Sequence, residues 1–530
     1  MARTSDLNQL EKQPPQSEIK PGQHNDIHTR VNRDHEHTNT TPLSDPAFMV
    51  KFEKDNPEDP RNFGSWHKVY ITCQLSMLTF VAALSSSILS PGQSDIAEYT
   101  HISSEVAVLA TSLYILGWAV GPTLWGPISE VYGRRWGMLP ALFCLGLFSI
   151  GTAASKNAAS IFITRFIGGI FGSAPISNAS AALSDLYAPK ERGIAVAFMM
   201  LCITGGPSVG PLIGSAVVAN SKLGWRWTMY IEAICCFALF ALATLTLSET
   251  YSLVLLKDKA KKMRKTTGDK RYWHPHEHES INFENALTKH FMRPLRCVIV
   301  PYSTRDHLLT FARMLATESI MACVAAYASF SYSLIYLCLQ VYPIVFEEER
   351  GYSPVIASLP FLGILVGTAC AVGLTFAYRT RYAKAVMENG RKAVPEARLP
   401  PLVLGGVLLP AGLFWLGWTA APEYSWALPT VAGVFVGAGN NIVFQQCINY
   451  LIDTYGPYAA SAVSATTMLR SLLAAGLPLA AKPMFHNLGV GPAASLLGGI
   501  ACLALPIPFV FMKYGRTLHE KSRFAPASSD

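Results

Sequence analysis

Residues 117–135, GWAVGPTLWGPISEVYGRR, determine how the rest of the chain is arranged. The first part reads as an apolar helix loosened by glycine and proline, and the second is a short turn with Glu130, Arg134 and Arg135. A charged turn this short, between two apolar runs that can each cross a bilayer, predicts a tight antiparallel pair of helices. Because the turn has three charges and no apolar face, we expect it to lie in water, and its arginines indicate the cytoplasmic side.

The composition is that of a membrane protein with many spans. Of the 530 residues, 50% are hydrophobic and only 15% are charged, and the mean hydropathy is +0.27. This composition is too apolar for a soluble protein of this size. The net charge of +8 comes from short basic segments between apolar runs, which favours membrane topology over nucleic-acid binding.

Hydropathy predicts an all-α membrane protein with about twelve transmembrane helices in two six-helix bundles. We expect a disordered tail at 1–65, a first bundle at 66–248, a central loop at 249–318, a second bundle at 319–512 and a tail at 513–530. Most lysines and arginines fall on the side of the Arg134 turn. Both tails and the central loop are therefore expected in the cytoplasm.

The two bundles contain a weak repeat. Asp185-Leu-Tyr187-Ala-Pro189 follows the fourth span, and Asp453-Thr-Tyr455-Gly-Pro457 follows the tenth, 268 residues further on (453 − 185). Six spans is an even number, so the two copies have the same orientation and are related by an axis along the membrane normal. Such a pair of bundles suits alternating access to a central site.

Several short stretches, in order along the chain, support a resemblance to a known family. They are Pro57–Asn62 with Trp66, Gly126–Arg135, Arg165–Gly169, Gly206–Gly214 and Pro395–Pro400. Together they resemble fungal members of the major facilitator superfamily, and are most similar to its twelve-span drug/proton antiporters. The resemblance runs from about Asn56 to the end of the twelfth span.

The turn after the second span is the first candidate site, with Gly126, Glu130, Gly133, Arg134 and Arg135. Glu130 and Arg134 are four residues apart across Gly133 and can bond each other or a neighbouring helix end. A solvated surface turn is the alternative. The resemblance implies that the acid and the arginines form a latch that closes the cytoplasmic side, although relatives more often have Asp where this chain has Glu130.

Arg165 and Glu232 are candidates for proton coupling. A cation inside an apolar span is costly unless it is paired or faces a wet cavity, although Arg165 can also snorkel to the outer interface. Arg165 and Glu232 lie at matching depths, roughly 6–8 Å of helix rise inside the outer ends of spans four and six, so they can pair. The resemblance implies a coupling role for Arg165. Arg470, in the middle of span eleven, can be a structural tie between helices, and its role stays open.

In span five, small residues at every fourth position leave one smooth face for a close partner helix, and two prolines bend the span. The residues are Gly206, Pro207, Gly210, Pro211 and Gly214. Ordinary helix packing accounts for part of this pattern. Its GPxxGPxxG form resembles the antiporter signature, which implies an exporter.

Two spans carry polar stripes on one helical face. Tyr332, Tyr336 and Gln340 follow this spacing in span seven, and Asn441, Gln445 and Asn449 follow it in span ten. The resemblance implies that both spans line the substrate cavity, and interhelical hydrogen bonds are the alternative. Relatives often have Glu where this chain has Gln340, so a proton or cation site is missing there.

No cofactor, metal or nucleic acid is expected. His274, His276 and His278 in the central loop read as solvated residues, and the basic residues Lys257–Lys265 beside them suit anionic lipid heads. The spans contain no set of catalytic residues, which argues against an enzyme, and a scaffold does not account for two matching halves. We expect a monomeric exporter of a small hydrophobic or cationic compound, driven by proton antiport, in the plasma membrane. The alternatives are an importer of a small nutrient and the vacuolar membrane.

Overall fold

The computed structural model describes residues 48–53, 56–187, 189–277, 318–388, 394–455 and 459–521. Within these ranges the secondary structure is helical, apart from one isolated bridge between Met49 and Trp273. Most of the expected N-terminal tail, residues 1–47, lies outside the description. So do residues 278–317 of the expected central loop and residues 522–530 at the C-terminus.

The first six spans correspond to six long helices. These are α1 (Ser65–Ser85), α4 (Leu109–Tyr132), α5 (Arg134–Ala154), α6 (Ala158–Leu186), α7 (Pro189–Val218) and α8 (Arg226–Thr246). The short elements η3 (Ser90–Gly92), α2 (Gln93–Thr100) and α3 (Ser104–Ala107) connect α1 to α4. Several of these helices extend beyond the apolar run that predicted them, because the helical hydrogen bonds continue where the side chains become polar.

The second six spans follow the same plan. Their helices are α13 (Ser319–Pro343), α15 (Phe361–Glu388), α16 (Leu399–Trp418), α17 (Ala427–Tyr455), α18 (Ala459–Leu488) and the pair α19 (Val490–Ala504) and α20 (Pro506–Lys521). The short elements are η6 (Ile344–Glu348), α14 (Pro354–Ser358) and η7 (Pro395–Arg398). The last span is divided at Pro506, because proline cannot donate the hydrogen bond that would continue α19.

Eleven helical segments of the described ranges are long and apolar enough to cross a membrane. The exception among the expected spans is α18, which carries Arg470 and Lys482. It nevertheless packs along α13 and α4, so it belongs to the same bundle of helices. The expected all-α membrane fold is confirmed.

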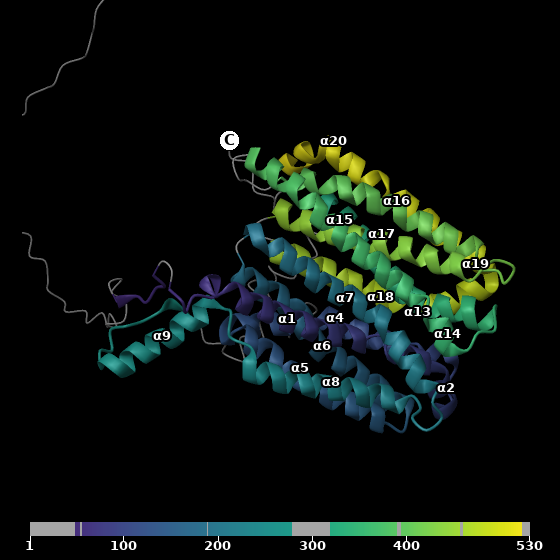
Figure 1. The fold of residues 1–530 in the computed structure, drawn as a ribbon, viewed down its shortest axis with the longest axis horizontal. Coiled ribbons are helices and arrows are strands. Elements are labelled where there is room, and N and C mark those ends of the chain that lie inside the picture. Colours follow the sequence, from purple (N-terminus) through teal and green to yellow (C-terminus); the bar gives the residue numbers. More distant parts are fainter. Residues whose placement is uncertain are drawn as a thin grey trace, which may run out of the picture.

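Two pairs of long helices make most of the contact between the halves. α4 of the first half packs against α18 of the second, and α7 packs against α15. The internal repeat relates α4 to α15 and α7 to α18. It therefore superposes the α4–α18 pair on the α15–α7 pair. Figure 1 shows the two sets of helices on either side of this contact, with α7 and α18 between them.

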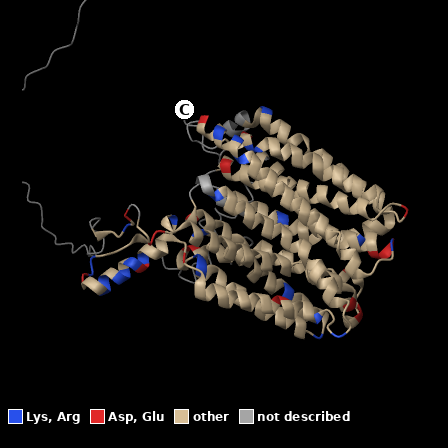
Figure 2. Ribbon diagram, in the orientation of Figure 1, with Lys and Arg blue, Asp and Glu red and all other residues tan. Residues whose placement is uncertain are grey.

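The bundle has two distinct ends, here named the α9 end and the α2 end after the elements that mark them in Figure 1. Large aromatic side chains are exposed near both ends, where they suit the membrane–water interface. Trp66 and Trp136 are 87% and 67% exposed at the α9 end, and Trp418 and Trp426 are 65% and 58% exposed at the α2 end. Charged residues gather at the same ends and are sparse between them (Figure 2).

Helix α9 (Ser252–Thr267) projects beyond the spans (Figure 1). Its buried residues Leu256 and Ala260 pack against Val50 of the segment that precedes α1. Lys259 lies 2.8 Å from Glu58, and this contact lowers the pKa of the Glu58 carboxyl. The contact of Lys257–Lys265 with lipid heads stays a prediction.

The expectation that the loop histidines are solvated is wrong for two of them. His274 and His276 are 7% and 3% exposed, and the His276 ring meets the edge of Tyr251 with 5.9 Å between ring centroids. The short element η4 (Pro275–Glu277) holds them against α9. His278 lies outside the described residues, and the described ranges contain no cluster of three metal-ligating side chains.

Candidate functional site

A buried ion pair lies between helices α6 and α8. Arg165 Nη1 is 3.8 Å from Glu232 Oε2, and the two side chains are 2% and 0% exposed. The matching depths expected from the sequence therefore bring these residues together. Arg165 points into the bundle and does not snorkel to the interface.

The surroundings hold the arginine more firmly than the acid. Arg165 Nε donates a hydrogen bond of 2.9 Å to the carbonyl of Ala110, and Nη2 donates one of 2.7 Å to the carbonyl of Ser85. Its guanidinium also lies over the Tyr114 ring, 4.3 Å from the centroid. These contacts fix the cation whether or not the acid is ionised.

Glu232 has one occupied oxygen and one free oxygen. Its Oε1 accepts hydrogen bonds of 2.5 Å from the hydroxyls of Ser85 and Ser149. Its Oε2 is buried without a hydrogen-bond partner and faces Arg165. A carboxylate arranged in this way can take up a proton at Oε2 while Oε1 keeps its position. The sequence did not single out Ser85, Ser149 or Tyr114, because neutral residues of these types are common in membrane helices.

The turn of the candidate latch consists of Gly133 alone, since α4 ends at Tyr132 and α5 begins at Arg134. The expectation that its three charges lie in water is wrong for Arg134, which is 9% exposed. Arg134 Nε is 2.9 Å from Asp185 Oδ2 at the end of α6, and Nη1 donates to Ser129 Oγ at 3.0 Å. Glu130 is exposed on the last turn of α4, and no ion pair of the described residues joins it to Arg134.

Glu249, after α8, secures this turn. Its Oε1 accepts a hydrogen bond of 2.9 Å from the backbone N–H of Arg134, and its Oε2 accepts one of 3.0 Å from that of Arg135. A carboxylate at the N-terminus of α5 satisfies free N–H groups and complements the helix dipole. Gly133 has φ 102°, and a Cβ there would collide with the Glu249 carboxylate. Glycine is therefore required on both grounds.

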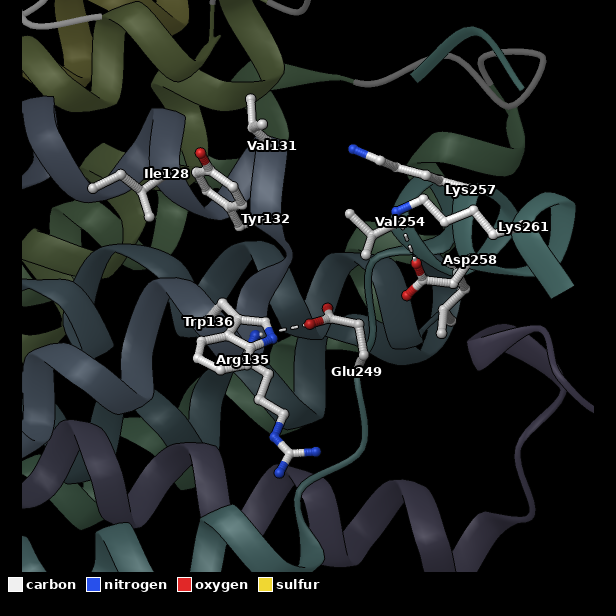
Figure 3. Close-up of a pocket in the computed structure, with 11 residues that line it drawn as sticks. Ile128, Val131, Tyr132, Arg135, Trp136, Glu249, Val254, Lys257, Asp258 and Lys261 are labelled. Carbon is white, nitrogen blue, oxygen red and sulfur yellow. Dashed lines mark hydrogen bonds and ion pairs between the residues drawn. The ribbon is translucent and has the colours of Figure 1, made fainter. Parts of the chain in front are cut away.

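A pocket of about 510 Å³ opens beside this turn. Figure 3 shows Glu249 directed at the start of α5, with Arg135 and Trp136 on one side and the basic residues of α9 on the other. The lining residues are Ile128, Val131, Tyr132, Arg135, Trp136, Glu249, Val254, Leu255, Lys257, Asp258 and Lys261. The turn is therefore held by Glu249, which follows α8, as well as by Asp185 of α6, and it faces α9 across the pocket. A latch role for Gly126, Glu130 and Arg135 stays a prediction.

The second half repeats the Arg134–Asp185 pair. Arg398 Nε, in η7 immediately before α16, is 2.9 Å from Asp453 Oδ2 at the end of α17. Tyr382 adds a hydrogen bond of 2.7 Å to the same oxygen, and its ring lies under the Arg398 guanidinium, 3.5 Å from the centroid. The aspartates are the two that mark the repeat in the sequence. Their arginine partners were missed because each comes from a different helix.

The glycine face of span five packs on the end of α1. A Cβ on Gly206 would lie 2.7 Å from Ala83 Cβ, and a Cβ on Gly210 or Gly214 would meet Ser87 or Ile88. The expected close approach of a partner helix is therefore present, and the partner is α1. The prolines at 207 and 211 lie inside α7.

The polar stripes of α13 and α17 bond across the contact between the halves. Tyr336 Oη is 3.1 Å from Ser86 Oγ in the first half, and 3.3 Å from Tyr332 Oη. Gln340 Nε2 donates a hydrogen bond of 3.0 Å to Gln93 Oε1. In this conformation these residues therefore form interhelical hydrogen bonds, which was the alternative interpretation. Their contact with a substrate stays a prediction.

The stripe of α17 behaves in a similar way. Asn441 Nδ2 donates a hydrogen bond of 3.2 Å to Thr204 Oγ1 of α7, which belongs to the other half. Gln445 Oε1 accepts one of 3.2 Å from Thr375 Oγ1 of α15, within the same half. The bond from Asn441 to Thr204 must break if the halves separate there, whereas the bond between Gln445 and Thr375 can persist.

Two bundles related by a repeat, with a buried charge pair and polar contacts between the halves, define a membrane transporter. The profile of the Major Facilitator Superfamily matches residues 75–478. The chain belongs to the major facilitator superfamily and is a transporter of small molecules rather than an enzyme.

The relatives are fungal transporters. The chain is 40% identical over 491 residues to the citrinin biosynthesis cluster MFS transporter mrr1 of Monascus ruber, covering 92% of this chain and 94% of that protein. It is 36% identical over 483 residues to the efflux pump bik6 of Gibberella fujikuroi, with 91% and 96% covered. It is also 36% identical over 483 residues to the multidrug transporter FLU1 of Candida albicans, with 90% and 76% covered.

Solved structures support the same fold. The proton:xylose symporter XylE superposes with a TM-score of 0.59 at 16% sequence identity, covering 85% of this chain and 97% of that one. At this identity the similarity concerns the fold alone. The resemblance inferred from short motifs is confirmed by these comparisons over most of the chain.

Proposed function

We propose that the protein exports a small compound in exchange for protons, by alternating access of one central site to the two sides of the membrane. The outward direction is supported by the relatives, whose names describe an efflux pump and a multidrug transporter. The GPxxGPxxG face of α7 supports the same direction. Uptake of a nutrient is the alternative function. Measurement of flux in both directions distinguishes uptake from export.

The observation that carries proton coupling is the Arg165–Glu232 pair. Arginine keeps its charge at every accessible pH, so the proton acceptor of the pair is Glu232. A proton bound at Oε2 removes the charge that faces Arg165, while the carbonyls of Ala110 and Ser85 hold the guanidinium in place. Loss of this attraction weakens the bridge between Arg165 of α6 and Glu232 of α8. The bound proton is thereby linked to the position of Ser85 at the end of α1.

Two hydrogen bonds between the halves support a role for the α2 end as a gate. They are the bond of 3.0 Å from Gln340 to Gln93, and one of 2.8 Å from Ser215 to Ser358. Both must break before the halves separate at that end. Neutral hydrogen bonds of this kind contribute about 0.5–1.5 kcal/mol each, so their exchange is compatible with rapid cycling.

The test uses purified protein in proteoliposomes with an imposed pH gradient of either sign. A set of radiolabelled aromatic compounds, neutral, cationic and acidic, is offered to the wild type and to Arg165→Ala. We expect the wild type to move at least one compound against its gradient, in the direction opposite to proton flow. Arg165→Ala should abolish proton-driven transport and preserve equilibrium binding of the compound. Arg165→Lys should restore proton-driven transport only poorly, because lysine lacks the planar fork of arginine.

A double variant separates coupling from folding. Arg165→Ala leaves the Glu232 carboxylate buried without its partner, which is destabilising by about 3–5 kcal/mol. Arg165→Ala with Glu232→Gln removes both charges and should restore the amount of folded protein, but not the proton drive. Full proton-driven export by either variant would refute the coupling role.

We further propose that the protein acts as a monomer in the plasma membrane, with both tails and the Arg134 turn in the cytoplasm. The distribution of lysine and arginine supports this orientation. A fluorescent fusion viewed in cells distinguishes the plasma membrane from the vacuole. Cross-linking of the protein in native membranes tests the oligomeric state.

A further inference from the structure

Arg470 in helix α18 is a buried cation without a described counter-charge. It is 5% exposed, its Nε has no hydrogen-bond partner, and none of the ion pairs among the described residues includes it. Two other arginines are buried among the described residues, and both are compensated: Arg165 by Glu232 and two carbonyls, and Arg134 by Asp185. A guanidinium that has left water without such partners is strongly disfavoured.

Two aromatic rings contact Arg470 and account for part of its stability. The guanidinium carbon lies 4.3 Å from the centroid of the Tyr332 ring and 5.0 Å from that of Phe444. The two ring centroids are 5.2 Å apart. Ring faces attract a cation but accept no conventional hydrogen bond, so they do not occupy the five N–H donors of the arginine. The donors remain available for an acceptor of another kind.

Arg470 also lies next to the contact between the halves. The ring beneath it belongs to Tyr332, whose hydroxyl is 3.3 Å from that of Tyr336, which in turn is 3.1 Å from Ser86 Oγ of α1. Ser85, the preceding residue, bonds both Arg165 and Glu232. A compound bound between the halves at this level therefore meets Arg470 on one side and the end of α1 on the other.

We propose that Arg470 binds an anionic group of the transported compound, a carboxylate or an ionised phenol, and that Tyr332 and Phe444 contact its aromatic body. This inference rests on the proposed transport function and specifies the class of substrate. A fixed central cation repels a cationic compound, which disfavours the cationic class expected from the sequence. Because arginine does not titrate, Arg470 keeps its positive charge at every accessible pH.

The experiment measures equilibrium binding to the full-length protein in lipid nanodiscs, with no proton gradient. The probes are aromatic carboxylates of one, two and three fused rings, each compared with the neutral amide of the same shape. We expect at least one acid to bind about 10- to 100-fold more tightly than its amide, the range for hydrogen bonds to a charged group. In Arg470→Met this preference should vanish, and in Arg470→Lys it should be reduced, because lysine offers no bidentate fork.

Lys482→Met is the matched control, since it removes one positive charge from the same helix and should keep the acid preference. If Arg470→Met does not fold, the comparison of acids with amides in the wild type still shows whether the protein prefers an anionic group. Equal binding of every acid and its amide by the wild type overturns the proposal, as does an unchanged preference in Arg470→Met. Acid preference without proton-driven flux would instead contradict the proposed antiport and leave the anion site standing.

Discussion

Replacement of Gly206 by alanine tests the close contact between α7 and α1. A Cβ at this position would lie 2.7 Å from Ala83 Cβ, 2.8 Å from the backbone nitrogen of Leu84 and 2.9 Å from the carbonyl carbon of Ala83. Favourable contacts between carbon atoms need about 3.5–4.0 Å, so the helices must separate by about 1 Å at this point. Two of the three atoms belong to the backbone of α1 and cannot rotate away. Overpacking of this kind costs about 1–3 kcal/mol.

The neighbouring residue supplies the control. A Cβ on Gly205 would meet only Leu365 Cδ1, at 3.1 Å, which is the flexible end of a side chain. Both substitutions gain about the same helix propensity, up to 1 kcal/mol, because both lie inside α7. The difference between the two variants therefore isolates the contact with α1.

The assay is thermal unfolding of the detergent-solubilised protein, followed by fluorescence-detected gel filtration, together with flux in proteoliposomes. We expect Gly206→Ala to unfold at a lower temperature than Gly205→Ala and to transport more slowly, since a displaced α1 also moves Ser85 away from Glu232. Equal unfolding temperatures for the two variants would show that α7 does not approach α1 this closely, and would refute the reasoning.

Three further predictions concern the turn at the α9 end and the topology. Asp185→Asn should lower the free energy of unfolding by about 1.5–3 kcal/mol, because Arg134 loses its charged acceptor. Glu130→Ala should change the free energy of unfolding by less than about 0.5 kcal/mol. Thermal unfolding of both variants checks this prediction, and equal losses of stability would contradict it. Glu249→Gln should destabilise by about 1–2 kcal/mol, since an amide has one acceptor oxygen for the N–H groups at the start of α5, with Glu130→Gln as the control in the same assay. Tags placed within residues 249–318 and after Met512 should both be inaccessible from outside intact cells, and labelling of either tag from outside would contradict the two-bundle topology.

Glu130 also allows the latch hypothesis to be separated from folding. Its side chain is exposed and is not in an ion pair within the described residues, so its loss should leave the amount of surface protein near normal. Reduced turnover in Glu130→Ala would then support the latch, and unchanged turnover would leave the interpretation of a solvated residue.

Much of the fold followed from hydropathy, because a helix that crosses the bilayer must satisfy its own backbone hydrogen bonds and cover about 30 Å with apolar side chains. The third apolar run, from Trp136 to Ala154, therefore predicts a span there, and α5 covers Arg134–Ala154. Span eleven was expected from sequence although it carries Arg470, and it appears as α18. The glycines of span five predicted a close helix contact because their spacing places them on one face.

The sequence also determined the depth of a charge in the membrane, since rise along a helix is fixed at 1.5 Å per residue. This is why Arg165 and Glu232 could be matched in depth before the arrangement of their helices was known. Which helices are neighbours was decided only by tertiary structure, because packing depends on the shapes of whole helical faces. Only the tertiary structure showed that Arg134 pairs with Asp185 and Arg398 with Asp453. It also showed that the glycines of α7 pack against α1. The isolation of Arg470 was likewise decided by the tertiary structure, because the absence of a described counter-charge becomes visible only when every surrounding helix is in place.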